Sequence, residues 1–328
     1  MNGPERPAAR DRLPAPRRAH RLTGDSAADR WTVTACSAGP GRLSEGPRWD
    51  AARGELLWVD VLAGRLHRAR LDASGQLEVM QTFQAHCHLG AAAPAADGGY
   101  VLAAGSGFLH VDDAGAVREL AQPEAGRTDV RMNDGACDPQ GRFWAGTMAY
   151  DEAPGAGCLY RLELDGRCTQ VLTGLTISNG IGWSPDGATM YLADSGTADI
   201  DAFDFDPATG DLGRRRTVVH VTMANAVPDG LTVDDLGSIW VALWNGSALA
   251  RYDPDGSLLA TVPLPVDRPT SCAFGDADGG TLFVTTARDG LDETALARQP
   301  DAGRLLRLDP PGVTGPPCVP YRGELAAT

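Results

Sequence analysis

The sequence predicts an all-β fold, a six-bladed β-propeller with a metal site in its central channel. Three observations support this prediction: a turn-rich composition, a repeat of about 45 residues, and polar side chains at one recurring position of that repeat. The 328 residues include 40 glycines and 23 prolines, and 43% of them are hydrophobic. This composition allows a large core but favours many short strands over long helices.

Each repeat begins with a turn rich in Asp and Gly, which a strand with an aromatic residue follows. In residues 138–144, for example, the turn "DPQG" precedes "RFW". The steps between successive aromatic residues are 42, 44, 47, 49 and 43 residues, with a mean of 45. The six aromatic residues are Trp58, Tyr100, Trp144, Tyr191, Trp240 and Phe283. A nearly constant step of this kind indicates a repeat architecture.

Further strands follow the aromatic strand in every repeat. One of them is typified by "LYRLELDG" (159–166), and a more variable one by "QLEVMQTF" (76–83). Four short strands in about 45 residues are typical of a propeller blade. Six blades would occupy residues 44–320, and "WTVTAC" (31–36) is expected to complete the last blade. A β-sandwich does not need a sixfold repeat, and an open solenoid would need capped ends, so both alternatives are less favoured.

The first 30 residues differ from the rest in composition. "MNGPERPAARDRLPAPRRAHRL" is rich in Pro, Ala and Arg, and no apolar stretch follows its Arg pair as an export signal would require. We interpret residues 1–30 as a disordered tail or as the result of an upstream start codon. Residues 31–328 are then expected to form a single propeller domain.

Charge and cysteine content restrict the partners and the compartment. The net charge of −14 argues against nucleic acid and anionic membranes as partners. No stretch approaches the length of a transmembrane helix. The seven cysteines are odd in number and dispersed, which favours a reducing cytoplasm. The oligomeric state is not readable from the sequence.

Polar residues recur at one position relative to the turn glycines. Asn133, Asn179 and Asp229 each lie eight residues before a turn glycine, and Glu45 lies nine before Gly54 in a longer turn. Equivalent positions of different blades meet at the axis, so these four side chains are expected to converge there. Their oxygens suit a divalent cation: calcium, magnesium or manganese, with Fe(II) and zinc as further candidates. The alternative is that Asn-Gly and Asp-Gly serve only as turn dipeptides.

Two other groups of residues are expected to play no part in a metal site. His86, Cys87 and His88 lie just before the channel position of the second repeat, and alternation in a strand places only the two histidines on one face. His88 is therefore a candidate for substrate contact. Asp234 and Asp235 belong to the turn of the fifth repeat and are expected to be ordinary turn residues.

Several stretches together resemble the family of senescence marker protein 30 (regucalcin), gluconolactonase and luciferin-regenerating enzyme. They extend from about Ser44 to Arg307 and include "RMNDGACDPQGRFWAGTM", "ISNGIGWSPDG", "VPDGLTVDDLGSIWVALWNG" and "TTARDGLDETALARQPDAGRLLRL". The resemblance implies a six-bladed propeller with one divalent cation in its channel. It also implies hydrolysis of a sugar lactone in carbohydrate catabolism.

The resemblance further implies a role for individual residues. It makes Glu45, Asn179 and Asp229 the metal ligands, and it makes Arg131 and Asn133 substrate-binding residues. A glutamate that contacts substrate in the family corresponds to Asp151, with Glu152 beside it, so the sugar preference is left open.

The chemistry of a lactone is consistent with these roles, and two other functions compete with it. A cation would polarise the lactone carbonyl, and Asp229 is the candidate general base for the attacking water. The competing functions are calcium binding without catalysis, and hydrolysis of other lactones or of phosphotriesters on the same scaffold.

Overall fold

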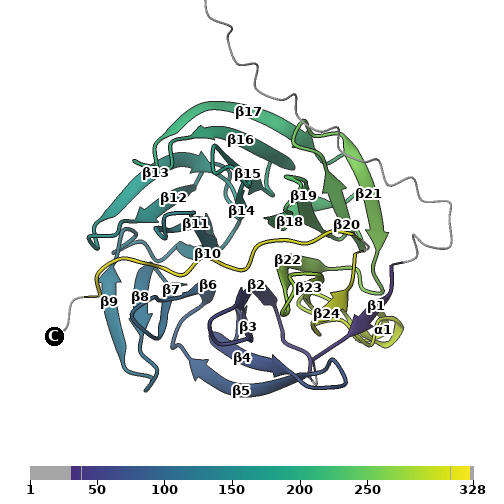
Figure 1. Cartoon of the computed structure of the whole chain (residues 1–328). Coiled ribbons are helices and arrows are strands. Elements are labelled where there is room, and N and C mark those ends of the chain that lie inside the picture. Colours follow the sequence, from purple (N-terminus) through teal and green to yellow (C-terminus); the bar gives the residue numbers. More distant parts are fainter. Residues whose placement is uncertain (1–30, 38, 311, 326–328) are drawn as a thin grey trace, which may run out of the picture.

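The computed structural model describes residues 31–325 except 38 and 311, and the predicted tail, residues 1–30, lies outside the described residues. The described chain forms six sheets of four strands each. The sheets are arranged in a ring, and one strand of each sheet, called its inner strand, lies nearest the axis (Figure 1). This arrangement is a six-bladed β-propeller, as the repeat predicts.

Five blades are consecutive runs of four antiparallel strands. Blade 1 consists of β2 (Ser44–Asp50), β3 (Glu55–Asp60), β4 (Arg65–Leu71) and β5 (Leu77–Gln84). Blade 2 consists of β6 (Leu89–Pro94), β7 (Tyr100–Ala104), β8 (Gly107–Val111) and β9 (Val117–Ala121). Blade 3 consists of β10 (Val130–Cys137), β11 (Phe143–Ala149), β12 (Gly157–Leu162) and β13 (Cys168–Leu175). Blade 4 consists of β14 (Ser178–Trp183), β15 (Thr189–Asp194), β16 (Asp199–Phe205) and β17 (Leu212–His220). Blade 5 consists of β18 (Val227–Val233), β19 (Ile239–Trp244), β20 (Ala248–Tyr252) and β21 (Leu258–Pro263).

The sixth blade joins the two ends of the described chain. It contains β22 (Pro269–Gly275), β23 (Thr281–Thr286) and β24 (Leu306–Leu308), and its outer strand is β1 (Val33–Ala35). Val33 pairs with Leu308 and Ala35 with Leu306. The expectation that residues 31–36 complete the last blade is confirmed. This pairing joins both ends of the described chain in one sheet and so closes the ring.

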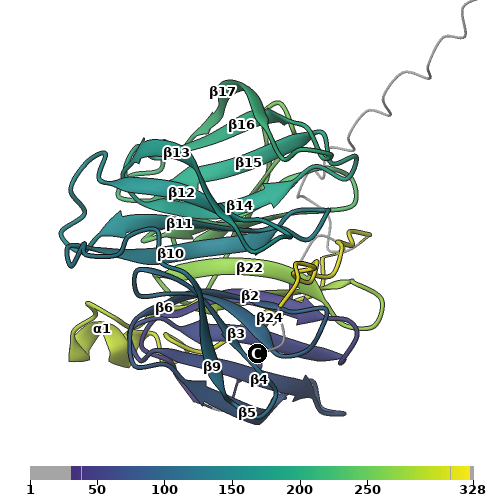
Figure 2. The ribbon, with the colours of Figure 1, turned by 90° about the vertical axis from the view of Figure 1, so that its left-hand side faces the viewer.

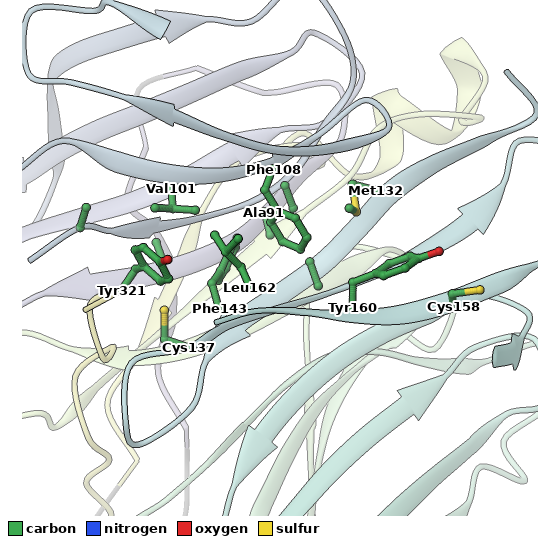
Figure 3. Close-up of a cluster of buried hydrophobic side chains, with 14 residues drawn as sticks. Ala91, Val101, Phe108, Met132, Cys137, Phe143, Cys158, Tyr160, Leu162 and Tyr321 are labelled. Atoms are coloured by element: carbon green, nitrogen blue, oxygen red, sulfur yellow. The ribbon is translucent and has the colours of Figure 1, made fainter. Parts of the chain in front are cut away.

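Apolar side chains fill every interface between neighbouring blades. The six repeat aromatics are buried in these interfaces, and Trp144 and Trp240 are 0% exposed. Figure 3 shows the cluster between blades 2 and 3, where Phe108 and Phe143 pack with ring centroids 5.8 Å apart. Trp144 and Trp240 face the following blade, whereas Trp58 and Tyr100 face the preceding one. Each aromatic lies in the strand next to the inner strand of its blade, where a large buried side chain fills one of the two interfaces, and this shared place explains the nearly constant step.

The turn between β10 and β11 shows how the repeated Asp and Gly residues form the hairpins. The Asp138 Oδ1 accepts hydrogen bonds from the Gln140 N at 2.9 Å and the Arg142 N at 3.0 Å. Gly141 has φ of 92°, which favours glycine. An aspartate and a glycine at these positions therefore stabilise a tight connection between two core strands.

The two ends of the channel differ. The short helix α1 (Glu293–Arg298) lies at one end, and residues 312–325, called the strap here, cross the other end (Figure 2). Among the described residues there is no helix whose length and apolar character would let it span a membrane. The end opposite the strap, where the inner strands begin, is called the mouth.

Candidate functional site

The inner strand of every blade contains an irregularity at the same level of the channel. Pairing with the second strand is interrupted between Met132 and Gly135 in β10, and the same happens in β2, β6, β14, β18 and β22. A bulge leaves residues outside the ladder and changes the direction of their side chains. The interrupted stretches of β10, β14 and β18 contain the polar residues Asn133, Asn179 and Asp229.

The glycines beside these polar residues allow the inner strands to approach each other. A Cβ on Gly180 would collide with the backbone of Asp229 and Leu231 in the next blade. A Cβ on Gly230 would collide with Ser271 in the blade after that. The Asn-Gly and Asp-Gly pairs therefore lie in strands, where the glycine is needed for close packing and not for a hairpin turn.

Two carboxyl groups share a buried region of the channel. Glu45 and Asp229 are 8% and 6% exposed. Burial, followed by the carboxylates of Asp229 and Asp134, raises the pKa of Glu45 well above its ordinary value. Burial and Asp134 likewise raise the pKa of Asp229, and the adjacent Asn179 and Glu45 side chains only partly oppose this effect. Two carboxylates in a dry site disfavour each other's ionised form unless a cation compensates their charge.

The Asn179 amide is fixed with its oxygen free. Its Nδ2 donates a hydrogen bond to the Ser195 Oγ at 3.0 Å, and the Ser195 Oγ donates to the Pro228 carbonyl at 2.7 Å. The Asn179 Oδ1 is buried and receives no hydrogen bond from the described residues. An unpaired buried oxygen next to two carboxyl groups is suited to binding a cation.

A cation here would depend on an amide as well as on carboxylates. Within the described part of the chain, no three His, Cys, Asp or Glu side chains lie together as a metal-binding group. Glu45, Asn179 and Asp229 instead offer two carboxylates and one carbonyl oxygen. Oxygen donors of this kind suit hard divalent cations such as calcium and magnesium.

Arg131 and Asn133 form a second, interlocked pair beside this site. The Arg131 Nη1 donates to the Asn133 Oδ1 at 2.7 Å and to the Met132 carbonyl at 3.0 Å. The Asn133 Nδ2 donates to the Ser178 carbonyl at 2.9 Å. The amide oxygen of Asn133 is thus already paired, whereas that of Asn179 is not. This difference supports the division between substrate-binding and metal-binding asparagines that the family resemblance implies.

Burial lowers the pKa of Arg131, and four neighbouring groups oppose that change. These groups are Tyr150, Glu45, Asp229 and Glu152, in order of effect. The guanidinium therefore lies between the buried carboxyl groups and the residues of the mouth. The positively charged Arg131 side chain in this position can bind hydroxyl oxygens or a developing carboxylate of a small molecule.

The mouth carries an aromatic pair that sequence reasoning found only in part. The His88 Nδ1 lies 3.2 Å from the Tyr150 hydroxyl, and the two rings are 5.4 Å apart. Burial lowers the pKa of His88, and the charges of Arg131 and Arg42 add to this effect. His88 is therefore close to Arg131, as a substrate contact would need to be. The sequence did not single out Tyr150, because a lone aromatic residue in a loop cannot be distinguished from an ordinary exposed residue.

The two acidic residues that follow Tyr150 in the same loop, Asp151 and Glu152, lie differently. The Asp151 Oδ1 accepts a hydrogen bond from the Ala153 N at 3.1 Å, so this carboxylate stabilises its own turn. Glu152 is exposed, has φ of 57°, and acts electrostatically on Arg131. Of the two, Glu152 is better placed to face a molecule bound at Arg131.

A buried ion pair lies next to the candidate cation site, since one of its members, Asp134, raises the pKa of both Glu45 and Asp229. The Arg48 Nη2 lies 3.4 Å from the Asp134 Oδ1 and donates to the Gly135 carbonyl at 2.9 Å. Arg48 and Asp134 are 7% and 4% exposed. The repeat gave no reason to select Arg48, because its partner is supplied by another blade, 86 residues along the chain.

Comparisons with known proteins agree with the sequence motifs. Residues 43–288 match a family model described as the SMP-30/Gluconolactonase/LRE-like region. Regucalcin from Bos taurus is 39% identical over 287 residues, covering 85% of this chain and 94% of the relative. The structure of a calcium-binding protein, regucalcin, from Agrobacterium tumefaciens matches with a TM-score of 0.80 and 32% identity, covering 87% and 95% of the two chains. A gluconolactonase from Xanthomonas campestris matches with a TM-score of 0.70 and 25% identity, covering 89% and 94%.

Proposed function

Because the chain belongs to the SMP-30/gluconolactonase/LRE-like family, we propose that it is a hydrolase that opens an aldonolactone to the aldonic acid. An aldonolactone is a cyclic ester of a sugar acid. The observation that carries the proposal is the Arg131–Asn133 pair beside the buried carboxyl groups, because a protein that only stores a cation has no need of a buried arginine there.

Glu45, Asn179 and Asp229 would hold a divalent cation. The free oxygen of Asn179 and the two buried carboxyl groups support this assignment. When bound, the cation would act as a Lewis acid on the lactone carbonyl. Its identity, among calcium, magnesium, manganese, zinc and Fe(II), is open because the donor set accepts each of them.

Arg131 and Asn133 would orient the sugar lactone. The hydrogen bond from Arg131 to Asn133 and the one from Asn133 to the Ser178 carbonyl hold both side chains in place before substrate arrives. Arg131 would bind ring hydroxyls and then the carboxylate that forms as the ester opens, where a charge-assisted hydrogen bond contributes most.

Asp229 would act as the general base. Burial raises the pKa of Asp229 in the cation-free protein, and a bound cation would favour the ionised carboxylate that can accept a proton. Asp229 would accept a proton from the attacking water as the oxygen of that water bonds to the carbonyl carbon. The ester C–O bond then breaks, and the same proton passes to the departing ring oxygen.

His88, Tyr150 and Glu152 would form the outer wall of the substrate site. The lowered pKa of His88 keeps the imidazole neutral beside Arg131 at neutral pH. The His88 and Tyr150 rings would pack against the apolar face of a sugar ring, and Glu152 would accept hydrogen bonds from its hydroxyls. These contacts would set the choice among lactones that differ in one hydroxyl.

A second candidate function is calcium binding without catalysis, because the Agrobacterium tumefaciens relative is described as a calcium-binding protein. The experiment that separates the two uses protein stripped with chelator and reloaded with each divalent cation. Glucono-, xylono-, arabinono- and galactonolactone are then assayed. Lactonase function predicts turnover of at least one of them, and Arg131→Gln should remove turnover while one cation per chain still binds. Cation binding without turnover of any lactone would favour the second function.

A further inference from the structure

The strap closes the end of the channel opposite the mouth. Hydrogen bonds tie it to several blades: Gly315 N donates to the Gly279 carbonyl at 3.1 Å, Cys318 N to the Trp49 carbonyl at 3.2 Å, and Arg322 N to the Gly141 carbonyl at 3.0 Å. Gly141 and Gly279 belong to the hairpin turns that follow inner strands. Figure 1 shows the strap, in yellow, running across the ring above the inner strands.

A cavity of about 320 Å³ lies between the strap and the ends of the inner strands. Its walls are mostly apolar and come from several blades, and Pro316 and Pro317 of the strap complete them. This volume is about twice that of an engineered cavity that binds benzene, and it lies at the lower end of the range for small-molecule sites. The cavity can therefore hold a molecule about the size of a fused bicyclic ring.

The cavity is separate from the candidate cation site. Arg48 is one of its lining residues, whereas Glu45, Asn179 and Asp229 are not. The partner of Arg48, Asp134, acts electrostatically on Glu45 and Asp229. The Arg48 Nη1 and Nη2 are already bonded to the Pro47 and Gly135 carbonyls at 2.8 and 2.9 Å. Arg48 is thus a fixed side chain that lines the cavity and is linked through Asp134 to the surroundings of the cation site.

Charges at the cavity select against ions of either sign. Arg48 is already paired with Asp134 and offers an anion little compensation for its lost hydration, and the solvent-exposed Asp235 offers as little to a cation. Asp234 is neutralised, since its Oδ2 lies 2.6 Å from the Arg251 Nη2. An uncharged ligand does not lose the hydration of a charge, and its binding is favoured by burial of apolar surface against the cavity walls.

We propose that the strap cavity is a second ligand site, distinct from the cation site, for a compact, uncharged and mainly apolar molecule. Trp49, Ile181, Leu231 and Phe274 supply its apolar contacts, and the strap prolines cover the ligand. This proposal does not depend on the proposed lactonase function, because none of these residues belongs to the cation or lactone site.

The test uses the full chain and prodan, an uncharged naphthalene ketone whose fluorescence shifts to the blue in apolar surroundings. We expect saturable binding of one prodan per chain. Chelator and millimolar gluconate should leave the affinity within twofold, because both act on the mouth compartment. Ala136→Phe places a ring in the cavity from β10 and should weaken binding at least tenfold.

A second filling variant, Val319→Trp, approaches the cavity from the strap and covers the case in which Ala136→Phe does not fold. The matched control is Val79→Trp, because Val79 is 48% exposed on the outer strand of blade 1 and far from the cavity in the fold. The control should bind prodan as the unmodified chain does. Absence of saturable binding, displacement by gluconate, or full binding by a folded filling variant would overturn the proposal.

Discussion

Replacing Asp229 by Asn should abolish lactone hydrolysis without unfolding the protein. The side chain keeps its shape and one carbonyl oxygen, but the negative charge and the proton acceptor are lost. General-base assistance typically contributes about 10²–10⁴-fold in rate. Weaker cation binding adds to this loss, because one of the two carboxylates in the proposed ligand set is removed. We therefore expect hydrolysis close to the uncatalysed background, even with excess cation.

Folding should survive the same substitution. Burial and the carboxylate of Asp134 disfavour the ionised form of Asp229 in the metal-free protein. The neutral amide removes this unfavourable charge, so the metal-free variant should melt at or above the Tm of the metal-free unmodified chain. A gain in stability together with a loss of activity is the signature of a functional residue that the fold does not require.

The assay follows acid release from gluconolactone near pH 6, with spontaneous hydrolysis subtracted at each pH. Asp255→Asn is the matched control, because it makes the same exchange on an exposed turn residue of the same blade. Its rate should stay within twofold of the unmodified chain. If Asp229→Asn retained substantial activity, Asp229 would not be the base. If it failed to fold, the residue would be structural, and the reasoning about its burial would be wrong.

Three further predictions concern the cation site and the chain start. Ser195→Ala should lower cation affinity about 10–100-fold, because the Asn179 amide loses the acceptor that orients it; calorimetry measures this, and unchanged affinity would contradict the assignment. In protein freed of cations by a chelator, the free energy of unfolding should rise as the pH falls from 7 to about 5. The reason is that the pKa values of Glu45 and Asp229 are higher in the folded than in the unfolded protein, so the folded state binds more protons. Saturating cation should flatten this dependence, and a fall in stability over the same interval without cation would refute it. Removing residues 1–28 should change neither Tm nor rate, since the first described strand begins at Val33; loss of folding would show that the domain begins earlier.

The architecture was predictable because the repeat constrains the sequence locally. Trp144 and Trp240 occupy one position in their blades and fill equivalent interfaces, so their spacing is visible without a structure. The same holds for Asn179 and Asp229, which share one level of the channel. Alternation in residues 31–36 was enough to predict the closing strand, because only the sixth blade lacked an outer partner.

Residues whose role depends on contacts outside their own strand and turn were not predictable. Asp234 looks like an ordinary turn residue, and that expectation is wrong: it is 0% exposed and accepts hydrogen bonds from the Trp240 Nε1 at 2.9 Å and the Arg251 Nε at 3.0 Å. Ser195 and Arg48 likewise act through partners far along the chain. No local pattern encodes such contacts, because they arise only when strands pair within a blade and the blades pack against each other.

The mouth was predicted only in outline for a similar reason. His88 was selected by its place in the repeat, but its partner Tyr150 lies in a loop whose course the strand pattern does not determine. The strap was missed altogether, since its backbone follows the turns of other blades and forms no repeat of its own.

The central claim is that Glu45, Asn179 and Asp229 hold one divalent cation that lactone hydrolysis requires. The most direct measurement is the rate of gluconolactone hydrolysis against the number of cations restored to fully chelated protein. The proposed site predicts background hydrolysis without cation and a linear return of activity that reaches its plateau at one cation per chain. Full activity in the chelated protein, or a plateau that needs several cations, would contradict the account.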